Sequence, residues 1–429
     1  MELLQGITTA IPEAFSVFTT VWTEGWFVIA PVVLAYMMYW YWQEFMVGRY
    51  FSGIKYINLH IEAPPENDQS PKVMEEFFNA VHGIHTNPNF TDYFWDGKIQ
   101  EGISVEMVGV DGDVSFIVRT PDYFKDLVEA HLYAQFPDVE IHEEPDYVEA
   151  VPKDFLKKGW DVFGSDIVLT TSDFYPIRSY ITFEHQMTQR IIDPIATIAE
   201  VMNKLGPGEQ LWIQFNIRPI LNDWAKRGQE FAKDLMGQET AAPTPAVIEA
   251  LGKVGSVAAT PMTGDTTAAD SYDAFPDAAF LMPPNERKVI ENIERNVSKQ
   301  AFEFKGRLLY VGKKEGFNKR RFNAIMGAFK QFSTFDMNGF MPYQKTMTKV
   351  SFFFKNIRVP IRQRKLMSGY KQRSFSIGAP VAVLNTESLA SVFHIPDVTV
   401  KAPRLPRTLS KKGSAPPNLP ITDQEVSRG

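Results

Sequence analysis

The sequence predicts an α+β protein in which an N-terminal transmembrane helix is followed by tandem ferredoxin-like (βαββαβ) units. Three observations lead to this prediction. A long uncharged stretch lies near the N-terminus, the order β-α-β-β-α-β can be followed between residues 54 and 148, and a looser α+β succession comes after it. At about 150 residues per domain, the 429 residues accommodate two or three domains.

The transmembrane prediction rests on Gly25–Gln43, which are 19 residues without a formal charge. As a helix this stretch would extend roughly 28 Å, close to the hydrocarbon thickness of a bilayer. Aromatic residues flank it as interfacial belts do, with Trp22 and Trp26 at one end and Tyr36, Tyr39, Trp40, Tyr41 and Trp42 at the other. A buried helix of a soluble protein and a cleaved signal peptide are the alternatives. The lack of Lys and Arg in the first 24 residues argues against a signal peptide.

Basic residues set the expected orientation. None precedes the span, whereas Arg49 and Lys55 follow it, so the positive-inside rule places the N-terminus outside and the bulk of the chain in the cytoplasm. We therefore expect a single-pass protein of the bacterial inner membrane. Residues 1–24 would form an interfacial segment on the outer side.

Residues 54–148 form the first predicted ferredoxin-like domain. Its expected strands cover 54–62, 98–109, 113–120 and 139–144, where apolar and polar residues alternate. Its expected helices cover 71–84 and 122–136, and Asp111-Gly112 has the composition of a tight hairpin turn. A sheet with one apolar face needs two helices to cover that face, and this segment supplies two.

Residues 160–237 and 285–385 form a second predicted α+β domain. Strands are expected at 166–171, 178–184, 209–219 and 300–312, and helices at 190–206, 221–237, 286–299 and 318–332. Residues 238–284 are rich in Ala, Pro, Thr and Gly with weak periodicity, which indicates a flexible insertion. Residues 386–429 are expected to form a helix followed by an extended tail.

Several kinds of chemistry are excluded or unsupported by the composition. With no cysteine the chain has no disulfide, cysteine nucleophile or thiolate metal site. The three Gly-Lys pairs lack the hydroxyl residue of a P-loop, and GxSxG, HExxH and GxGxxG are absent. His82 and His85 lie near the end of a predicted helix without a third ligand in the neighbouring sequence, which favours packing over metal binding. We therefore expect no enzyme activity, cofactor or metal, although a pocket of unrecognised catalytic residues would not show in a sequence.

Charge is distributed very unevenly along the chain. Residues 285–429 hold 27 Lys and Arg against 10 Asp and Glu, a net charge of +17, whereas residues 1–284 hold 17 against 41, a net charge of −24. Basic residues interleaved with aromatic ones suit DNA or anionic lipid. They equally suit docking on an acidic protein partner or on the acidic half of this chain, and charge alone does not separate these possibilities. The candidates for contact with DNA or another anionic partner are Lys313, Lys314, Lys319, Arg320, Arg321, Arg358, Arg362, Arg364 and Lys365.

Near the C-terminus, Leu384–Ala390 and Phe393–Pro396 resemble an element that lies just before the ATPase module of type IV secretion and conjugation ATPases, and Pro416–Pro420 resemble the stretch that follows this element there. These ATPases belong to the HerA/TraG/FtsK superfamily, and weaker similarity extends over residues 56–420. The chain ends at Gly429, where the resembling proteins begin their nucleotide-binding domain. The resemblance therefore implies the membrane-anchored, non-ATPase region of such a machine.

From the anchor, the charge and this resemblance we expect a non-catalytic component of a DNA-transfer or type IV secretion-like machine. It would dock an ATPase motor subunit supplied in trans, and DNA is a further expected partner; self-association is left open. The segment expected to dock the motor is the 384–396 helix, capped by Thr386, through Leu384, Asn385, Glu387, Leu389, Phe393 and His394. Packing of these residues on the second domain is the alternative for this helix. The alternative function is a membrane-surface scaffold or anionic-lipid-binding protein unrelated to DNA.

Overall fold

The computed structural model describes residues 2–62, 69–183, 193–236 and 283–396, with the side chains of the first helix described from residue 25 onward. The chain forms two compact units. Unit 1 combines Met1–Lys55 with Thr86–Glu101, and unit 2 combines Tyr56–His85 with Gly102–Gly429. The predicted insertion, apart from its last two residues, and the predicted tail from residue 397 lie outside the described residues.

Unit 1 consists of the long helix α1 (Glu2–Gly53) and the short helix α3 (Phe90–Asp96). The Trp42 indole donates a hydrogen bond to the Phe94 carbonyl (2.9 Å), and the rings of Trp42 and Trp95 meet edge to face. The sequence placed Thr86–Glu101 within the first ferredoxin-like domain, whereas the structure assigns it to the unit of α1. The stretch Gly25–Gly53 is apolar and long enough to be a membrane span or a signal sequence, and none of its most apolar window is buried.

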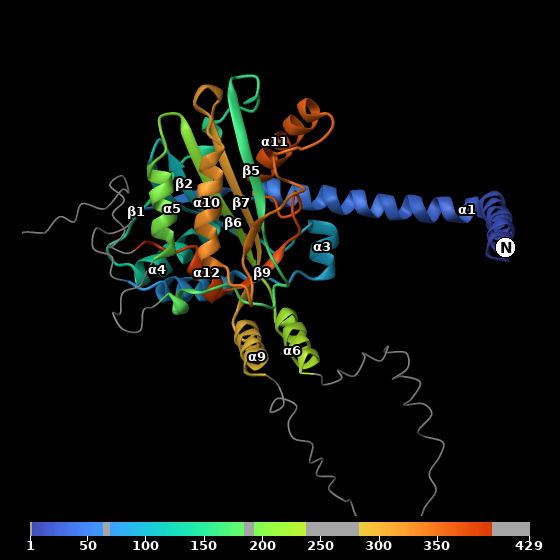
Figure 1. Ribbon diagram of the computed structural model, residues 1–429, viewed down its shortest axis with the longest axis horizontal. Coiled ribbons are helices and arrows are strands. Elements are labelled where there is room, and N and C mark those ends of the chain that lie inside the picture. Colours follow the sequence, from blue (N-terminus) through green and yellow to red (C-terminus); the bar gives the residue numbers. More distant parts are fainter. Residues whose placement is uncertain (1, 63–68, 184–192, 237–282, 397–429) are drawn as a thin grey trace, which may run out of the picture. The chain divides into compact units, whose positions relative to one another are not determined.

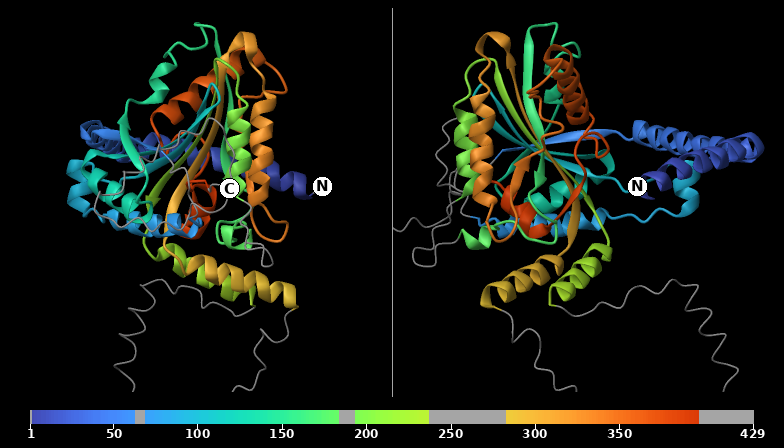
Figure 2. Two further views of the ribbon diagram at one scale, coloured as in Figure 1. Left: turned by 90° about the vertical axis from the view of Figure 1, so that its left-hand side faces the viewer. Right: turned by 45° about the vertical axis from the view of Figure 1, so that its right-hand side comes forward.

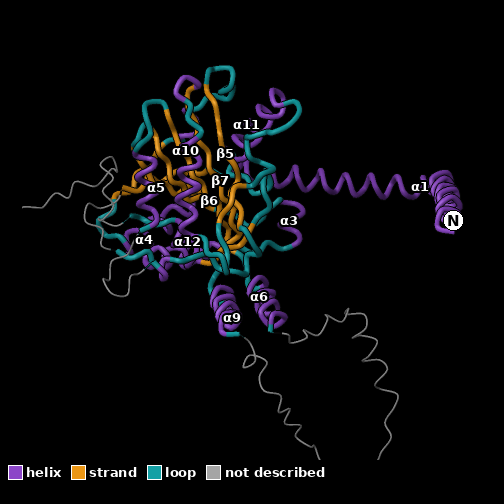
Figure 3. Tube along the Cα trace, viewed as in Figure 1, coloured by secondary structure: helices purple, strands orange, loops and turns teal. Residues whose placement is uncertain are grey.

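Unit 2 is built on one antiparallel sheet, which contains nine strands within the described part of the chain (Figures 1 and 3). The strands are β1 (Tyr56–Glu62), β2 (Ile103–Val110), β3 (Asp113–Pro121), β4 (Glu140–Glu144), β5 (Trp160–Leu169), β6 (Glu209–Pro219), β7 (Ala301–Lys313), β8 (Phe340–Pro342) and β9 (Ala382–Asn385). The prediction of an α+β architecture behind one apolar N-terminal helix is therefore confirmed at this level.

The strand order is β4-β1-β3-β2-β6-β7-β5-β8, and β9 pairs with β7 near that strand's start. Pairing between β2 and β6, with Val105 opposite Phe215, joins the two predicted domains into one continuous sheet. The predicted hairpin turn is confirmed between β2 and β3. Asp111 (φ 54°) and Gly112 (φ 96°) both occupy the left-handed region that a tight two-residue hairpin requires.

Helices cover both faces of the sheet, as Figure 2 shows for α5 and α10 on one side and α11 on the other. The first face carries the largest core, to which α2, α4, α5, α10 and α12 contribute. The second face is covered by α11 and the short turn at Tyr147–Ala150, which bury Val148, Leu366 and Met367 against strand residues such as Trp212. The helix bounds are α2 (Lys72–Val81), α4 (Lys125–Gln135), α5 (Pro194–Asn203), α10 (Arg320–Phe329), α11 (Lys355–Lys371) and α12 (Thr386–Val392).

Two further helices, α6 (Asp223–Leu235) and α9 (Pro284–Val297), form a separate small core around Trp224 and Ile293. They flank the sequence segment predicted to be the insertion. The predictions of helices at 221–237 and 286–299 are confirmed to within two residues at each end.

One predicted strand is wrong. Residues 178–183 form a short 3-10 turn around Tyr180–Thr182 rather than a strand. The Tyr180 amide donates to the Ser391 hydroxyl (2.9 Å), and the Tyr180 hydroxyl donates to the Glu75 carboxylate (2.6 Å). The alternation of apolar residues is therefore satisfied by packing between α2 and α12, and no strand partner is needed.

Candidate anion-binding surface

The structure divides the nine predicted cationic residues between two places in unit 2. Lys313–Arg321 lie where β7 ends and α10 begins, whereas Arg358–Lys365 lie on α11. Seven of the nine side chains are exposed, and Arg321 and Arg362 are half-buried. The nine predicted candidates therefore form two groups with different neighbours.

The first group gains two lysines that the sequence analysis missed. The Lys314 amide donates to the Gly159 carbonyl (2.9 Å), its side-chain amine reaches the Leu156 carbonyl (3.5 Å), and Lys313 pairs with Trp160 across the β5–β7 ladder. The exposed Lys157 and Lys158, which precede β5, therefore lie beside the end of β7. We call the resulting set the sheet-end cluster, and it comprises Lys157, Lys158, Lys313, Lys314, Lys319 and Arg320.

The side chains of the sheet-end cluster are available to an anion. Among the described residues none of its six cations forms an ion pair, although the Lys319 amine lies 5.5 Å from the centre of the Phe163 ring. The six cations come from two strand ends and a helix start, and only two exposed carboxylates, Glu315 and Asp154, lie in the same two segments (residues 154–158 and 313–320). The cluster therefore keeps a net positive charge, and its cations repel one another. An anionic ligand with several charges would relieve this repulsion.

Arg321 is excluded from the sheet-end cluster by an internal contact. Its guanidinium pairs with Glu209 (3.2 Å), which also accepts from the Tyr310 hydroxyl (2.6 Å) and the Gly206 amide (2.7 Å). Burial alone would raise the pKa of Glu209, but these hydrogen bonds and the Arg321 charge outweigh it and lower the pKa. Burial, together with the nearby Glu209 carboxylate, raises the pKa of Tyr310 to about 12. Arg321 therefore stabilises the start of β6.

On α11, the four predicted cationic residues have unequal roles. The Arg362 guanidinium donates to the carbonyls of Met347 (2.8 Å) and Lys349 (2.9 Å), so it fixes the loop that precedes the helix. Arg358, Arg364 and Lys365 are exposed. Only these three present their charges fully to solvent.

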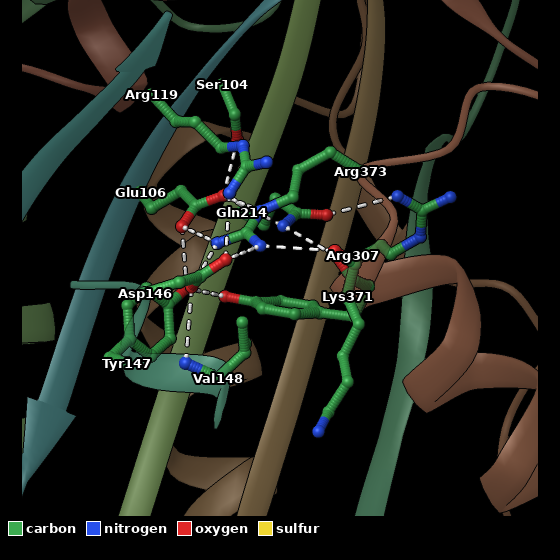
Figure 4. Close-up of polar contacts among 11 residues, drawn as sticks. Ser104, Glu106, Arg119, Asp146, Tyr147, Val148, Gln214, Arg307, Lys371 and Arg373 are labelled. Atoms are coloured by element: carbon green, nitrogen blue, oxygen red, sulfur yellow. Dashed lines mark hydrogen bonds and ion pairs between the residues drawn. The ribbon is translucent and has the colours of Figure 1, made fainter. Parts of the chain in front are cut away.

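Behind α11 lies a buried polar network that the sequence did not predict (Figure 4). Glu106, on β2, is completely buried and accepts hydrogen bonds from the Tyr147 hydroxyl (2.7 Å), the Gln214 amide (2.9 Å) and the Arg373 guanidinium (3.0 Å). Arg373 also pairs with Asp146, to which Arg119 donates as well (2.8 Å). This network ties the residues after α11 to the middle of the sheet.

A second buried ion pair extends the network. The Arg307 guanidinium contacts Asp166 (3.2 Å) and donates to the Gln214 side chain (3.1 Å) and the Ile377 carbonyl (2.9 Å). Asp166 also accepts from the Ala379 amide (2.7 Å). Next to it, Gly378 (φ 106°) is required, because a Cβ there would lie 2.2 Å from the Asp166 carboxylate. We infer that the network has a structural role and holds residues 373–379 in place, because its donors form hydrogen bonds with acceptors inside the protein.

We expect the Glu106 carboxylate to contribute to the free energy of unfolding in a way that is lost at acidic pH. Burial would raise its pKa, but the charge and hydrogen bonds of Arg373 outweigh burial and lower the pKa from 4.5 to about 2. Because the folded pKa lies below the unfolded one, this contribution of about 3 kcal/mol is complete above pH 4.5 and is lost as the pH falls toward 2. Urea unfolding of the wild type and Glu106→Gln between about pH 6 and pH 3 tests this. The fall in the free energy of unfolding should be shallower in the variant, and parallel curves would contradict the prediction.

Comparison with known proteins identifies the family. A profile described as "Domain of unknown function (DUF8128)" matches residues 57–407, which is most of the 429-residue chain. The chain belongs to the DUF8128 family. No curated protein matches it. The DUF8128 match begins within β1, so it includes the sheet-end cluster, α11 and the buried network and leaves α1 outside.

The predicted docking segment is part of the DUF8128 core. Leu384 and Asn385 end β9, and α12 follows, with the exposed fraction at most 7% for each of the six predicted docking residues Leu384, Asn385, Glu387, Leu389, Phe393 and His394. The N-cap is Asn385, whose side chain accepts from the Ser388 amide (2.8 Å), and not Thr386 as predicted. These side chains are not exposed to a partner in this structure, so packing, the alternative kept for this segment, accounts for them.

The polar members of this segment have internal partners. Glu387 pairs with Lys299 (2.7 Å) and Arg295 (3.1 Å). The ring of His394 contacts the Asp193 carboxylate (3.0 Å) and the Ala390 carbonyl (2.8 Å). Helix α12 therefore connects β9 to α9 and to the start of α5.

His82 and His85, the two histidines that the sequence analysis considered for metal binding, are packed against protein groups of the DUF8128 domain. His82 contacts the Ile220 carbonyl (3.0 Å), and its ring stacks on that of His85 at 6.3 Å between centroids. Burial and the neighbouring His82 lower the pKa of His85. At the β1–β4 edge, Glu62, Glu140 and His142 bring potential metal-ligating atoms within 4.8 Å of one another. This set was not predicted from the sequence, and among the residues that the structure describes no second feature at this edge points to a ligand.

Proposed function

We propose that this chain is a membrane-anchored binding component of a DNA-transfer or type IV secretion-like machine, which holds DNA at the cytoplasmic face of the bacterial inner membrane. The proposal gives the chain a binding role. ATP hydrolysis is left to a motor subunit supplied in trans, and no catalytic residue, cofactor or metal is assigned to this chain.

The observation that carries the proposal is the sheet-end cluster. Six exposed cations come together from two separate sequence segments, 157–158 and 313–320, without ion pairs among the described residues. Phosphates of a DNA backbone supply closely spaced negative charges that such a cluster would neutralise, with release of condensed counterions. The sequence signal for Lys157 and Lys158 is weak, because they lie in the acidic two-thirds of the chain.

The anchor and the fold are consistent with this role. We infer that α1 spans the membrane with its N-terminus outside, since Arg49 and Lys55 follow the apolar stretch. We also infer that unit 2 is a tandem of ferredoxin-like units, because each half has the same order of connected strands, β4-β1-β3-β2 and, read from the other edge, β8-β5-β7-β6. The resemblance to the membrane-anchored part of conjugation ATPases supports the choice of DNA among anionic ligands.

DNA binding that depends steeply on salt is the expected result for the purified full-length chain in detergent. Each phosphate contact contributes about −0.9 to the slope of log K against log salt for duplex DNA and about −0.7 for a single strand. Replacement of Lys157, Lys158, Lys313 and Lys314 by glutamine should therefore weaken binding and reduce the slope by about 3. Fluorescence anisotropy with labelled duplex and single-stranded oligonucleotides measures both quantities.

The matched control replaces four exposed lysines elsewhere, Lys204, Lys226, Lys233 and Lys288, by glutamine. It makes the same change in net charge, so it should reproduce only the small nonspecific loss of affinity. No binding by the wild type at low salt, or equal slopes for the two variants, would rule out the sheet-end cluster as a DNA site.

A further inference from the structure

The loop before α11 and the first half of that helix expose an unusual amount of apolar surface. Phe352, Phe353 and Phe354 are 76%, 81% and 74% exposed, and Ile357 and Ile361 are 61% and 56% exposed. Single exposed apolar residues are normal on a soluble surface, whereas a contiguous set of this size marks an interaction site. We call these five residues the aromatic wedge.

The fold presents the aromatic wedge away from the core. Only the second half of α11 is buried, through Leu366, Met367 and Tyr370, whereas the first half lies at the periphery of the body (Figure 1). Within the wedge, Ile357 and Ile361 are one helical turn apart and therefore lie on the same face of α11. The Arg362 hydrogen bonds to the Met347 and Lys349 carbonyls hold the preceding loop against the helix.

The backbone at the start of α11 gives an independent sign that this surface is functional. Phe354 is the N-cap of the helix and has φ 60°, in the left-handed region that large side chains rarely adopt. Because the Phe354 side chain is 74% exposed, its packing in this structure contributes little to offset the cost of the left-handed backbone conformation. Strain retained at an exposed aromatic residue points to a contact made outside this body.

The charge around the aromatic wedge selects an anionic partner. Residues 337–386 contain nine Lys and Arg and no Asp or Glu. Four exposed cations lie on α11: Lys355 and Arg358 between wedge residues, and Arg364 and Lys365 after them. Aromatic side chains that insert at the headgroup level, with cations beside them, are the features that bind a peripheral surface to anionic lipid.

Two observations favour a lipid surface over nucleic acid for this site. Ile357 and Ile361 are aliphatic and offer no ring on which a base would stack, whereas both are suited to acyl chains. In addition, only Ile54 and Lys55 separate the end of α1 from the start of β1, so a membrane-embedded α1 would tether the body close to the bilayer.

We propose that the aromatic wedge docks unit 2 onto the anionic leaflet of the membrane. Phe352, Phe353 and Phe354 enter the headgroup region, and Lys355 and Arg358 contact the lipid phosphates and carboxylates. This proposal uses residues outside the sheet-end cluster, so membrane docking and DNA binding are tested separately.

The test uses the absence of cysteine from the chain. A Phe353→Cys variant of the full-length protein, labelled with the environment-sensitive dye NBD, is reconstituted into nanodiscs of phosphatidylcholine with or without phosphatidylserine. With phosphatidylserine the NBD emission should shift to the blue, and nitroxide carried on the lipid chains should quench it by about twofold or more. Without phosphatidylserine both effects should be smaller.

Two controls make the result specific. Phe335→Cys labels another fully exposed phenylalanine, which lies beside Asp336 rather than among cations, and its NBD emission should remain that of a solvated dye. Lys355→Glu with Arg358→Glu in the Phe353→Cys background should abolish the response to phosphatidylserine, and these exposed substitutions leave the core intact. Emission at position 353 that is equal in both kinds of nanodisc overturns the proposal. A blue shift at position 353 that nitroxide on the lipid chains does not quench also overturns the proposal and identifies a second copy of the chain as the occupant.

Discussion

Replacement of Arg373 by alanine is expected to lower the free energy of unfolding by about 3–5 kcal/mol. The guanidinium is the shared cation of two carboxylates, Glu106 and Asp146, and its side chain is 8% exposed. Removal of this cation leaves the fully buried Glu106 carboxylate hydrogen-bonded only to neutral donors, among them Tyr147 and Gln214. A buried charge that loses its partner costs far more than an exposed ion pair contributes.

Urea unfolding followed by tryptophan fluorescence measures this loss, since Trp212 packs against Tyr147 and Tyr370 beside the network. Arg364→Ala provides the control, because Arg364 is an exposed cation on α11, the helix that precedes Arg373. It should change the free energy of unfolding by less than about 0.5 kcal/mol. A loss below about 1 kcal/mol for Arg373→Ala would show that the network does not stabilise the fold.

Arg307→Met is expected to destabilise the protein by a similar amount, about 3–5 kcal/mol. Arg307 is 1% exposed and Asp166 is fully buried, so the substitution removes the guanidinium that forms an ion pair with the Asp166 carboxylate in the core. It also removes the donors that hold the carbonyls of Ser374 and Ile377, which belong to the segment after α11. The expected result is early unfolding that exposes the second face of the sheet.

Lys305→Met is the control that separates the effect of removing a buried cation from the effect of breaking a buried ion pair. Lys305 is 2% exposed on the same strand, but its amine has a carbonyl partner, that of Phe375 (2.6 Å), rather than a carboxylate. Burial and the neighbouring Arg307 charge lower the pKa of Lys305 to about 8, so the folded protein already disfavours its charge. Methionine should cost about 1 kcal/mol or less there, as expected for one hydrogen bond lost. Equal losses for the two variants would contradict a role for the Arg307–Asp166 pair.

Local patterns were sufficient for most of the strands and helices. Alternation predicted β1, β2, β3 and β6, and helical spacing predicted α2, α4 and α10, because each of these elements buries one regular face against the first core. Asp111-Gly112 predicted its turn because few other dipeptides tolerate two positive φ values.

Where local patterns failed, the deciding contact was distant in sequence. Helix α11 carries Pro360 and many charges, so its spacing gave no signal, and only the second face of the sheet makes it a helix with a buried side. Glu106 occupies a strand position that the alternation marks as outward, yet it is buried because Tyr147 and Arg373 cover it. Residues 178–183 alternate like a strand but pack as a turn against α12, more than 200 residues later.

The candidate sites show the same division. The basic character of the C-terminal third was readable directly, because net charge does not depend on folding. The separation of these charges into the sheet-end cluster and the exposed cations of α11 was not readable, since Lys157 and Lys158 join the cluster only through the β5–β7 pairing. Leu389 and His394 are likewise buried because α12 packs into the core on the first face of the sheet.

By itself, the sequence determined an apolar helix long enough to cross a membrane, an α+β body and a cationic C-terminal third, since length, periodicity and charge are local or additive properties. Only the tertiary structure decided which of those charges are neutralised inside the core, which face solvent and which apolar side chains remain uncovered. The physical reason is that burial and ion pairing depend on long-range contacts, and a linear pattern does not specify which distant residues will meet.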